Sequence, residues 1–290
     1  MTIGFTHPER HPIMQAYSAI RVSAGCGLTI LALCTAAQAQ TSQSPASEIT
    51  PYKAVYRLEF APAGKSSPFT GGTASLTVEY TGSRCTEYRM IRTVKGTLNS
   101  DRGPIRLTSE AVFAENPAGT QLAFAFIEHV NGQKSRQHNV MARRNAGGGV
   151  TVTSSQLPNG RIELPRDVNL PLYGERLIMD AASGGRKSLT LKVYNPEVSL
   201  TSHEETALAF GPEVSNALPK GHPADIDALR NKPRKRVEIV ARSATGKVRM
   251  KEKLTRFNNS ILTTSQVLDD QLQIKANLAS LTMLPQKPCS

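Results

Sequence analysis

Apolar and polar side chains alternate with a period of two along most of this chain. Leu76, Val78 and Tyr80 are separated by polar residues, and residues 271–278 repeat the pattern without a break. This period is typical of a strand with one buried side and one solvent-facing side. Such runs predict strands over residues 52–60, 76–80, 88–94, 105–113, 121–130, 140–144, 150–153, 161–164, 188–194, 208–210, 236–242, 248–257, 261–268 and 271–278.

The residues between these runs predict how the strands connect. Gly, Pro and Asn separate the runs at close intervals, and Asn131-Gly132 has the composition of a tight hairpin turn. Many short strands joined in this way indicate an all-β protein with one large antiparallel sheet, curled into a spiral or an open barrel. We find no repeat of fixed period, which argues against a propeller.

Helical spacing replaces the alternation once, around residues 171–183. Apolar residues recur there three and four positions apart, as on the buried side of an amphipathic helix. Pro171 suits the first position of a helix, and Gly184-Gly185 suits its end. Residues 211–234 read as a basic, proline-containing insertion, with a second short helix predicted over 224–230.

The first 39 residues have the composition of a signal peptide. Arg21 precedes an apolar run over 24–37, and Ala37-Gln38-Ala39 matches a cleavage site. The run is shorter than the about 20 residues that cross a bilayer, so we expect no transmembrane span. The sequence leaves open whether Met1 or Met14 is the start.

The rest of the chain is predicted to hold one folded domain. Residues 40–51 are polar and are expected to be a disordered tether. Residues 52–290 are expected to form a single domain, since β domains of roughly 200–250 residues are ordinary. Only 5% of the residues are aromatic, so the core must be mainly aliphatic.

The cysteine count changes once the leader is removed. Of four cysteines, only Cys85 and Cys289 lie outside it. An even pair in an exported chain favours a disulfide, which would tie the last strand to an early hairpin. Two unpaired thiols are the alternative. A zinc site needs further Cys or His residues at ligand spacing, and these are missing from the sequence.

Several short marks resemble the cell-envelope integrity EipB family of periplasmic proteins in Gram-negative bacteria. They are Ala-Val-Tyr-Arg-Leu at 54–58, Gly-Ser-Arg-Cys-Thr-Glu-Tyr at 82–88, Leu-Pro-Arg-Asp-Val-Asn-Leu-Pro at 164–171, Lys-Val-Tyr-Asn at 192–195, and the late Cys289. The resemblance covers nearly all of residues 52–289. It implies a spiralling, barrel-like sheet with one helix, a Cys85–Cys289 disulfide, a periplasmic location and a role in envelope integrity under stress. It implies no enzymatic activity.

Motifs of catalysis and cofactor binding are missing from the sequence. There is no G-x-S-x-G nucleophile frame and no H-E-x-x-H metal frame. His203-Glu204-Glu205 is interpreted as part of a solvent-facing loop, and Gly147-Gly148-Gly149 lacks the Lys-Ser/Thr that follows in a P-loop. We therefore expect no cofactor and no metal, and an uncharacterised hydrolase is the weakest hypothesis.

Charge adds one candidate surface. The net charge is +12, with a pI near 9.7, which favours anionic partners. The densest basic run contains Lys232, Arg234, Lys235 and Arg236. Export excludes nucleic acid, so the run is either a solvated loop or a contact with anionic headgroups or lipopolysaccharide phosphates.

The first functional hypothesis is a non-enzymatic periplasmic protein that supports envelope integrity. Its curled sheet would offer a concave, largely aliphatic cleft to a lipid, a peptide or an envelope protein. The alternative is a scaffold that adds a partner's strand to an exposed sheet edge. The oligomeric state cannot be read from the sequence.

Overall fold

One sheet contains all fifteen strands of the part of the chain that the computed structural model describes, namely residues 45–214, 218, 220–286 and 289. The strands are β1 (Tyr52–Pro62), β2 (Phe69–Gly82), β3 (Tyr88–Ser100), β4 (Gly103–Glu115), β5 (Gln121–Val130), β6 (Gln133–Arg144), β7 (Val150–Thr153), β8 (Arg161–Leu164), β9 (Val168–Asn169), β10 (Ser188–Tyr194), β11 (His203–Glu213), β12 (Arg234–Ser243), β13 (Val248–Phe257), β14 (Leu262–Leu268) and β15 (Leu272–Met283). A single-turn 3₁₀ helix, η1 (Pro158–Gly160), precedes β8, and α2 (Pro171–Ser183) lies between β9 and β10. The all-β architecture predicted from the sequence is therefore confirmed.

The strand order joins the two halves of the chain through its first and last strands. It runs β8-β7-β6-β5-β4-β3-β2-β1-β15-β14-β13-β12-β11-β10-β9. Neighbouring strands are antiparallel except β9 and β10, which are parallel. β1 pairs with β15 from Tyr52↔Met283 to Pro62↔Leu272. Each half is thus a meander of sequential strands, and one long-range pairing fuses them into a single sheet.

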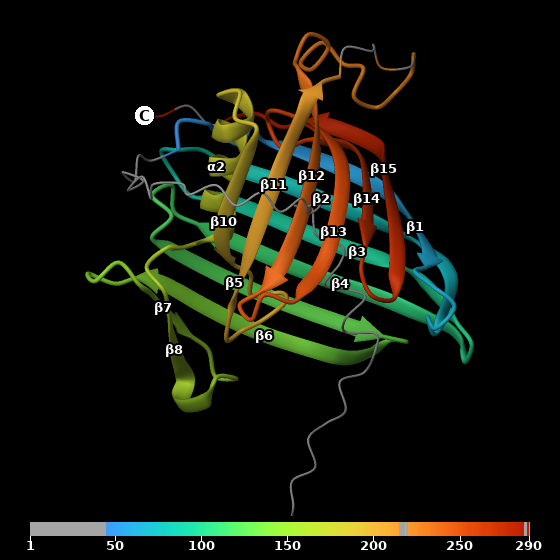
Figure 1. Cartoon of the computed structure of the whole chain (residues 1–290), viewed down its shortest axis with the longest axis horizontal. Coiled ribbons are helices and arrows are strands. Elements are labelled where there is room, and N and C mark those ends of the chain that lie inside the picture. Colours follow the sequence, from blue (N-terminus) through green and yellow to red (C-terminus); the bar gives the residue numbers. More distant parts are fainter. Residues whose placement is uncertain (1–44, 215–217, 219, 287–288, 290) are drawn as a thin grey trace, which may run out of the picture.

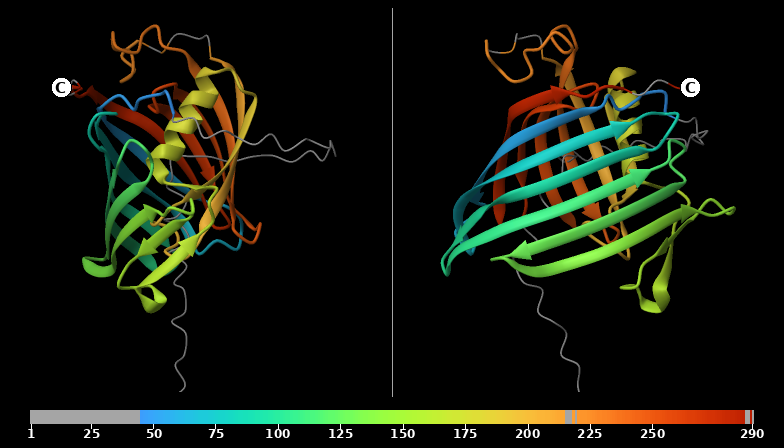
Figure 2. Two further views of the ribbon diagram at one scale, coloured as in Figure 1. Left: turned by 90° about the vertical axis from the view of Figure 1, so that its left-hand side faces the viewer. Right: turned by 180° about the vertical axis from the view of Figure 1, so that it is seen from behind.

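The sheet curls into a nearly closed, barrel-like shell. In Figure 1 the strands β1–β6 form one wall and β10–β15 the other, crossing it at an angle. Figure 2 shows α2 lying between the two walls. The predicted helix over 171–183 is confirmed, and it lies across one end of the shell.

The inward positions of the strands build the core. Tyr52, Tyr56 and Tyr88 are among the largest fully buried side chains, and Tyr52 and Tyr80 pack with ring centroids 5.3 Å apart. Burial raises the pKa of the Tyr52, Tyr56 and Tyr80 hydroxyls above the ordinary value. These few aromatics supplement the mainly aliphatic core predicted from the composition.

The start of β2 differs from its prediction. β2 begins at Phe69, seven positions before the predicted strand, because its first half contains Gly71 and Gly72 and carries no apolar alternation. Gly72 is paired with both Phe60 and Leu98, so its neighbours impose the extended conformation.

The short helix predicted over 224–230 is wrong. Turns occupy this segment, within the loop between β11 and β12. Ala224 and Leu229 are buried, so the segment is fixed by packing. Isolated helices this short are marginal, and helical spacing alone does not form one.

Candidate functional site

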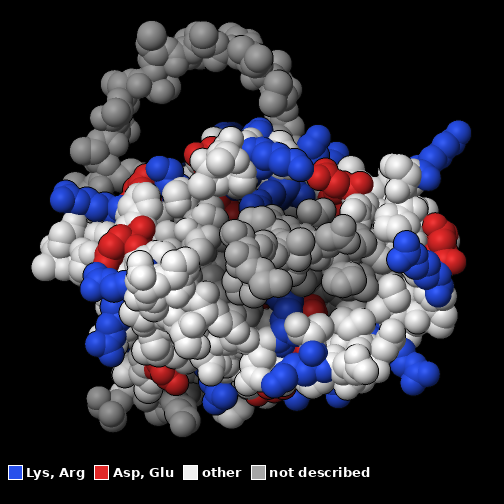
Figure 3. Space-filling view, turned by 90° about the horizontal axis from the view of Figure 1, so that it is seen from below, with Lys and Arg blue, Asp and Glu red and all other residues white. Residues whose placement is uncertain are grey.

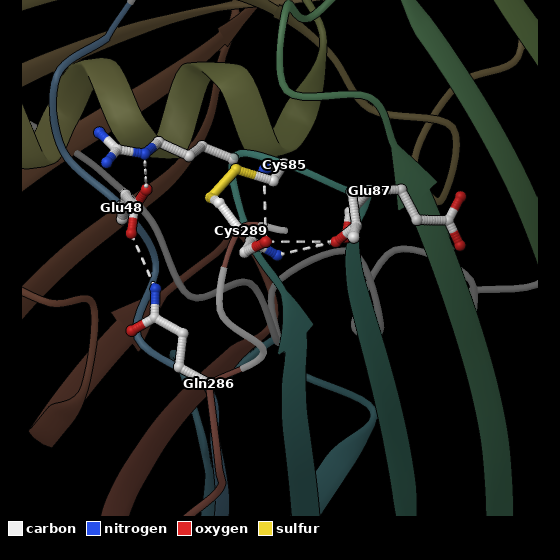
Figure 4. The surroundings of a disulfide bond; sticks show 8 residues. Glu48, Cys85, Glu87, Gln286 and Cys289 are labelled. Carbon is white, nitrogen blue, oxygen red and sulfur yellow. Dashed lines mark hydrogen bonds and ion pairs between the residues drawn. A yellow bond between two sulfur atoms is a disulfide. The ribbon is translucent and has the colours of Figure 1, made fainter.

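A disulfide joins Cys85, in the turn between β2 and β3, to Cys289 beyond β15 (Figure 4). Their Cα atoms lie 5.5 Å apart across 204 positions of sequence, so the predicted pairing is confirmed. Glu48 lies beside the disulfide and contacts one residue near each of the two cysteines. Its carboxylate contacts Arg84 at 2.9 Å and accepts a hydrogen bond from Gln286 at 2.8 Å. The hairpin and the C-terminal segment are therefore linked twice, once covalently and once through Glu48.

The N-terminus of α2 is capped from a distant strand. Its N-cap residue, Leu170, has no side chain that can accept a hydrogen bond. Glu115 at the end of β4 accepts instead, from the backbone N–H of Leu172 at 2.9 Å and of Tyr173 at 2.6 Å. These donors are otherwise unsatisfied in a helix, and an anion is favoured at that terminus. Burial nevertheless raises the pKa of the Glu115 carboxyl to about 8, although both N–H bonds lower it.

The middle of α2 is bound to the turn between β13 and β14. Glu175 accepts hydrogen bonds from Arg256 and, at 2.6 Å, from the hydroxyl of Ser260. All three residues are buried. Ser260 has a φ of 74°, a left-handed conformation that is unfavourable for serine. The turn thus holds a strained backbone in the conformation that places this hydroxyl on Glu175.

The predicted disordered tether over 40–51 is wrong for residues 45–51, which pack against α2; residues 40–44 and the predicted leader lie outside the described residues. Arg176 donates to the carbonyls of Ser47 and Pro45 at 3.0 Å and 2.9 Å. Asp180 accepts from the backbone N–H of Ser47 at 2.7 Å, and Ile49 is buried in the core. A polar composition predicts disorder, but here a helix offers charged partners to the backbone groups of the segment.

The inward side of the shell carries buried polar residues among its apolar ones. Arg92 and Glu197 form an ion pair of 2.7 Å between β3 and the loop after β10. His138 bonds the carbonyl of Pro196 at 3.1 Å, and burial lowers its pKa. Other buried inward residues in this region are Ser109, Glu128, Glu204, Thr206, Glu252 and Ser265. This lining differs from the concave aliphatic cleft predicted from the sequence, because charged residues such as Arg92 and Glu197 pair with one another across the shell.

An apolar groove of about 640 Å³ lies instead on the outer side of β4, β5 and β6. The outer side is identified by alternation, since Leu122 and Phe124 are buried inward and Ala123 and Ala125 face the other way. The turn between β7 and β8 forms one wall. The groove is lined by Val112, Ala114, Ala123, Phe124, Ala125, Asn139, Val140, Met141, Thr153, Ser154, Ser155 and Gly160.

Arginines lie on the same face at the margins of the groove. Arg89 is the cross-strand partner of Ala114, and Arg161 is the partner of Thr153. Directly paired residues share one face of a sheet. Arg143 lies on this face as well, two positions after Met141, and all three arginines are exposed. Arg161 forms an ion pair with Glu163 at 2.6 Å, so the positive charge of the margin comes mainly from Arg89 and Arg143. An apolar floor with a cationic margin suits an anionic amphiphile.

A signal for this groove is present in the sequence, although it was not among the features that predicted a binding surface. Strand β5 reads Gln-Leu-Ala-Phe-Ala-Phe-Ile, so its outward positions carry alanine where a polar residue is expected. Small apolar residues on an outward face leave space for a ligand and keep an apolar surface exposed to water. Met141, which is 41% exposed, is the clearest single mark of that surface.

The four predicted anion-binding residues do not share one environment. Lys232 and Arg236 are exposed. Lys235 donates to the carbonyl of Ala182, in the last turn of α2, and the guanidinium of Arg234 lies 6.0 Å from the ring centroid of Phe257. Figure 3 views the molecule from below, the end away from the loop between β11 and β12. On that face, Lys and Arg side chains are interspersed with Asp and Glu around the periphery of the molecule. Only Lys232 lies in a loop, since β12 begins at Arg234, and anion binding by this basic run stays a prediction.

Neither a metal site nor a membrane-spanning helix is found in the described part of the chain. No three His, Cys, Asp or Glu residues within it are grouped so as to hold a metal ion. None of its helices has the length and apolar character needed to cross a bilayer. His203 and Glu204, predicted in a loop, begin β11 instead, and Glu204 is buried.

Together these features define a barrel-like β protein whose curled sheet is closed at one end by one helix and whose C-terminal segment is joined to the β2–β3 turn by a disulfide. The chain belongs to the EipB-like family, whose model matches residues 43–285. The resemblance noted in the sequence is thereby confirmed.

A solved structure has the same architecture. It is the crystal structure of a β-barrel-like protein of the domain of unknown function DUF1849 from Brucella abortus. The TM-score is 0.75 at 16% sequence identity, over 82% of this chain and 99% of that chain. At this identity the likeness supports the fold. No protein with a curated description matches the chain.

Proposed function

We propose that this protein is a non-enzymatic periplasmic protein that supports cell-envelope integrity by holding the acyl chain of an anionic amphiphile on its sheet. The observation that carries the proposal is the apolar groove on β4–β6 with arginines at its margin. Its volume of about 640 Å³ falls within the usual range of small-molecule sites. Membership in the EipB-like family and the disulfide support an envelope location.

The roles of the buried carboxylates support a function without catalysis. Glu115 caps a helix, and Glu175 is bound by Arg256 and Ser260. These two of the buried acids thus hold α2 in place. Structural ion pairs and hydrogen bonds account for their burial without a substrate.

Ala125→Glu tests the groove directly. Ala125 is exposed on its floor, so a carboxylate there places charge where the acyl chain would lie. We expect affinity for a fluorescent fatty acid to fall about tenfold or more, which corresponds to about 1.4 kcal/mol. Ala279→Glu is the matched control, because Ala279 is an exposed alanine on β15, outside the groove. Equal affinity in both variants and the wild type would overturn the proposal.

The cationic margin is tested separately. Replacing Arg89 and Arg143 with Gln should weaken binding of the fatty acid and flatten its salt dependence. Binding of the corresponding neutral alcohol should change little. Mass spectrometry of lipid extracted from the purified protein then shows whether an anionic amphiphile is carried from the cell; its absence from every preparation would contradict carriage.

A further inference from the structure

Strand β6 is paired along its whole length on one side only. It contains twelve residues, Gln133–Arg144, and β5 pairs along nearly all of this length. On the other side β7 pairs only with residues 141–144. Figure 1 shows β7 and β8 covering just one end of β6. Within the described residues, the edge from 133 to 140 has no strand beside it.

The backbone groups of alternate residues at this edge point away from β5, and no strand of the described residues pairs with them. The carbonyl of Gln137 accepts a hydrogen bond from the side chain of Gln156, which lies on the β7 side. Backbone groups of successive strand residues point to alternate sides, so those of Asn139 face the same way. Both residues are exposed. The Gln156 amide therefore occupies a position that a strand's N–H would otherwise take.

A slot of about 300 Å³ adjoins this edge. β6 forms one wall, and the loop after β10 forms the other, with Gln156 at one end. Two side chains hold the walls apart: Arg136 donates to the carbonyl of Glu197 at 2.9 Å, and His138 bonds that of Pro196 at 3.1 Å. Because side chains span the distance between β6 and this loop, the two backbones are too far apart to form hydrogen bonds with each other. The edge of β6 therefore stays unpaired.

The charges at this edge favour an acidic occupant. Lys134 is exposed at one end of this edge, and Arg143 is exposed beyond its other end, where β6 pairs with β7. Arg136 lies over the ring of Phe126 with a separation of 4.8 Å. The nearby acid Glu128 is buried and accepts a hydrogen bond from Ser135 at 2.6 Å. The chain as a whole carries a net charge of +12. An extended segment with acidic side chains matches this edge better than a basic one.

We propose that the free edge of β6 binds an extended, acidic segment of a partner protein by strand addition, in line with β7. The segment's backbone pairs with Gln137 and Asn139 and displaces the side chain of Gln156. Alternate side chains of the segment then enter the slot beside His138, and the others face Lys134 and Arg143. Strand addition of this kind takes its affinity from the main chain and its specificity from alternate side chains. The edge adjoins the groove, whose lining includes Asn139, but strand addition does not require an amphiphile in the groove.

Asn139→Pro is the decisive variant, made in the mature, disulfide-bonded protein. Proline removes the N–H that faces the free side but leaves the pairing of β6 with β5, a position where edge strands tolerate proline. Asn139→Ala is the matched control, because it keeps the backbone donor. The probe is a fluorescent peptide of about seven alternating valine and glutamate residues, the length of a typical strand.

We expect the valine–glutamate peptide to bind the wild type and Asn139→Ala alike, and Asn139→Pro about tenfold more weakly. Gln156→Ala should bind more tightly, since the competing amide is gone. Methylation of alternate peptide amides should abolish binding, and a valine–lysine peptide should bind weakly or not at all. Arg89→Gln, at the groove margin on β3 and three strands away from β6, should leave peptide binding unchanged, which separates this edge from the groove.

Equal binding of the peptide to Asn139→Pro and to the wild type would overturn strand addition, as would full binding of the methylated peptide. Equal binding of the lysine peptide would overturn the acidic specificity. If Asn139→Pro unfolds, as judged by its circular dichroism, Gln156→Ala and the methylated peptide still decide the question.

Discussion

Glu115, the last residue of β4, and Leu172, in the first turn of α2, are joined by a hydrogen bond of 2.9 Å although 57 positions separate them in the chain. This carboxyl fixes the helix at the end of the shell. Because burial raises its pKa, it also makes the stability of the fold depend on pH.

The stability of the protein should fall as the pH rises from about 4.5 to about 8. The folded pKa of Glu115 is about 8 and its ordinary value is 4.5, so the unfolded chain releases its proton first. Over this interval the folded state holds a proton that the unfolded state lacks. The free energy of unfolding therefore falls with each pH unit, and the total loss is at most about 5 kcal/mol. Urea unfolding at pH 5, 6.5 and 8 measures the effect.

The Glu115→Gln variant isolates this contribution. Its free energy of unfolding should lack the fall between pH 4.5 and 8 that Glu115 causes in the wild type. His138 acts in the opposite direction, since burial lowers its pKa, so the comparison must be between the two proteins at each pH. Parallel pH profiles would contradict a raised pKa at Glu115.

Breaking the buried pair of Glu175 and Arg256 should destabilise the protein strongly. Arg256→Met leaves the Glu175 carboxylate buried without its cation, which typically costs about 3–5 kcal/mol. Replacing both residues with apolar ones, Glu175→Leu with Arg256→Met, should recover much of that loss. A double-mutant cycle by urea unfolding measures it, and a double variant no more stable than the single one would show that the pair acts through other contacts.

Reduction of the disulfide should lower the melting temperature. The loop closed by Cys85 and Cys289 spans 204 positions, for which chain entropy predicts a loss of up to about 5 kcal/mol. Cys85→Ser with Cys289→Ser should match the reduced wild type and no longer respond to reductant. In that background Glu48→Ala should destabilise further, because Glu48 links Arg84 to Gln286 without the disulfide. An unchanged melting temperature after verified reduction would contradict a stabilising disulfide.

Gly82→Ala should destabilise the hairpin that carries Cys85. Gly82 has a φ of 94°, which an L side chain rarely adopts, and a methyl group there would collide with the backbone carbonyl of Glu87. We expect a loss of about 1–3 kcal/mol by urea unfolding. Gly132→Ala, a control with similar φ but open space around the new methyl group, should lose less.

The basic run at the start of β12 should bind anionic vesicles in a salt-sensitive way. Lys232 and Arg236 are exposed, so replacing both with Gln should weaken binding by about 1 kcal/mol per charge. Lys235→Gln should act mainly on stability, since Lys235 contacts the carbonyl of Ala182 at the end of α2. Vesicle sedimentation at low and high salt measures the effect. If the double variant binds as well as the wild type, the basic run is solvated and does not bind anionic headgroups.

The sequence predicted the parts of the fold that are local. Period-two alternation identified most strands, and Pro171 with its helical spacing located α2 within a residue or two. It could not predict how α2 is held, because Glu115, Arg256 and Ser47 lie far from the helix in sequence and become its partners only when the sheet curls.

The interior was misjudged for the same reason. When the sequence of one strand is considered alone, burial of a charged inward residue such as Arg92 in β3 is unfavourable. Its partner Glu197 lies 105 positions later, in a loop on the other wall. The groove was missed for a simpler reason: Ala123 and Ala125 looked like ordinary strand residues, and only the curled sheet with the β7–β8 turn beside it gives them a common surface.

The pairing of β1 with β15 also constrains how the chain matures. Tyr52 is among the first strand residues to be synthesised, and its partner Met283 is made 231 residues later. Until then β1 has β2 on one side and a row of unsatisfied amides on the other, a template for aggregation. Until the final strand has been made, the free edge of β1 must therefore be covered by a chaperone, or β15 must pair with it soon after synthesis.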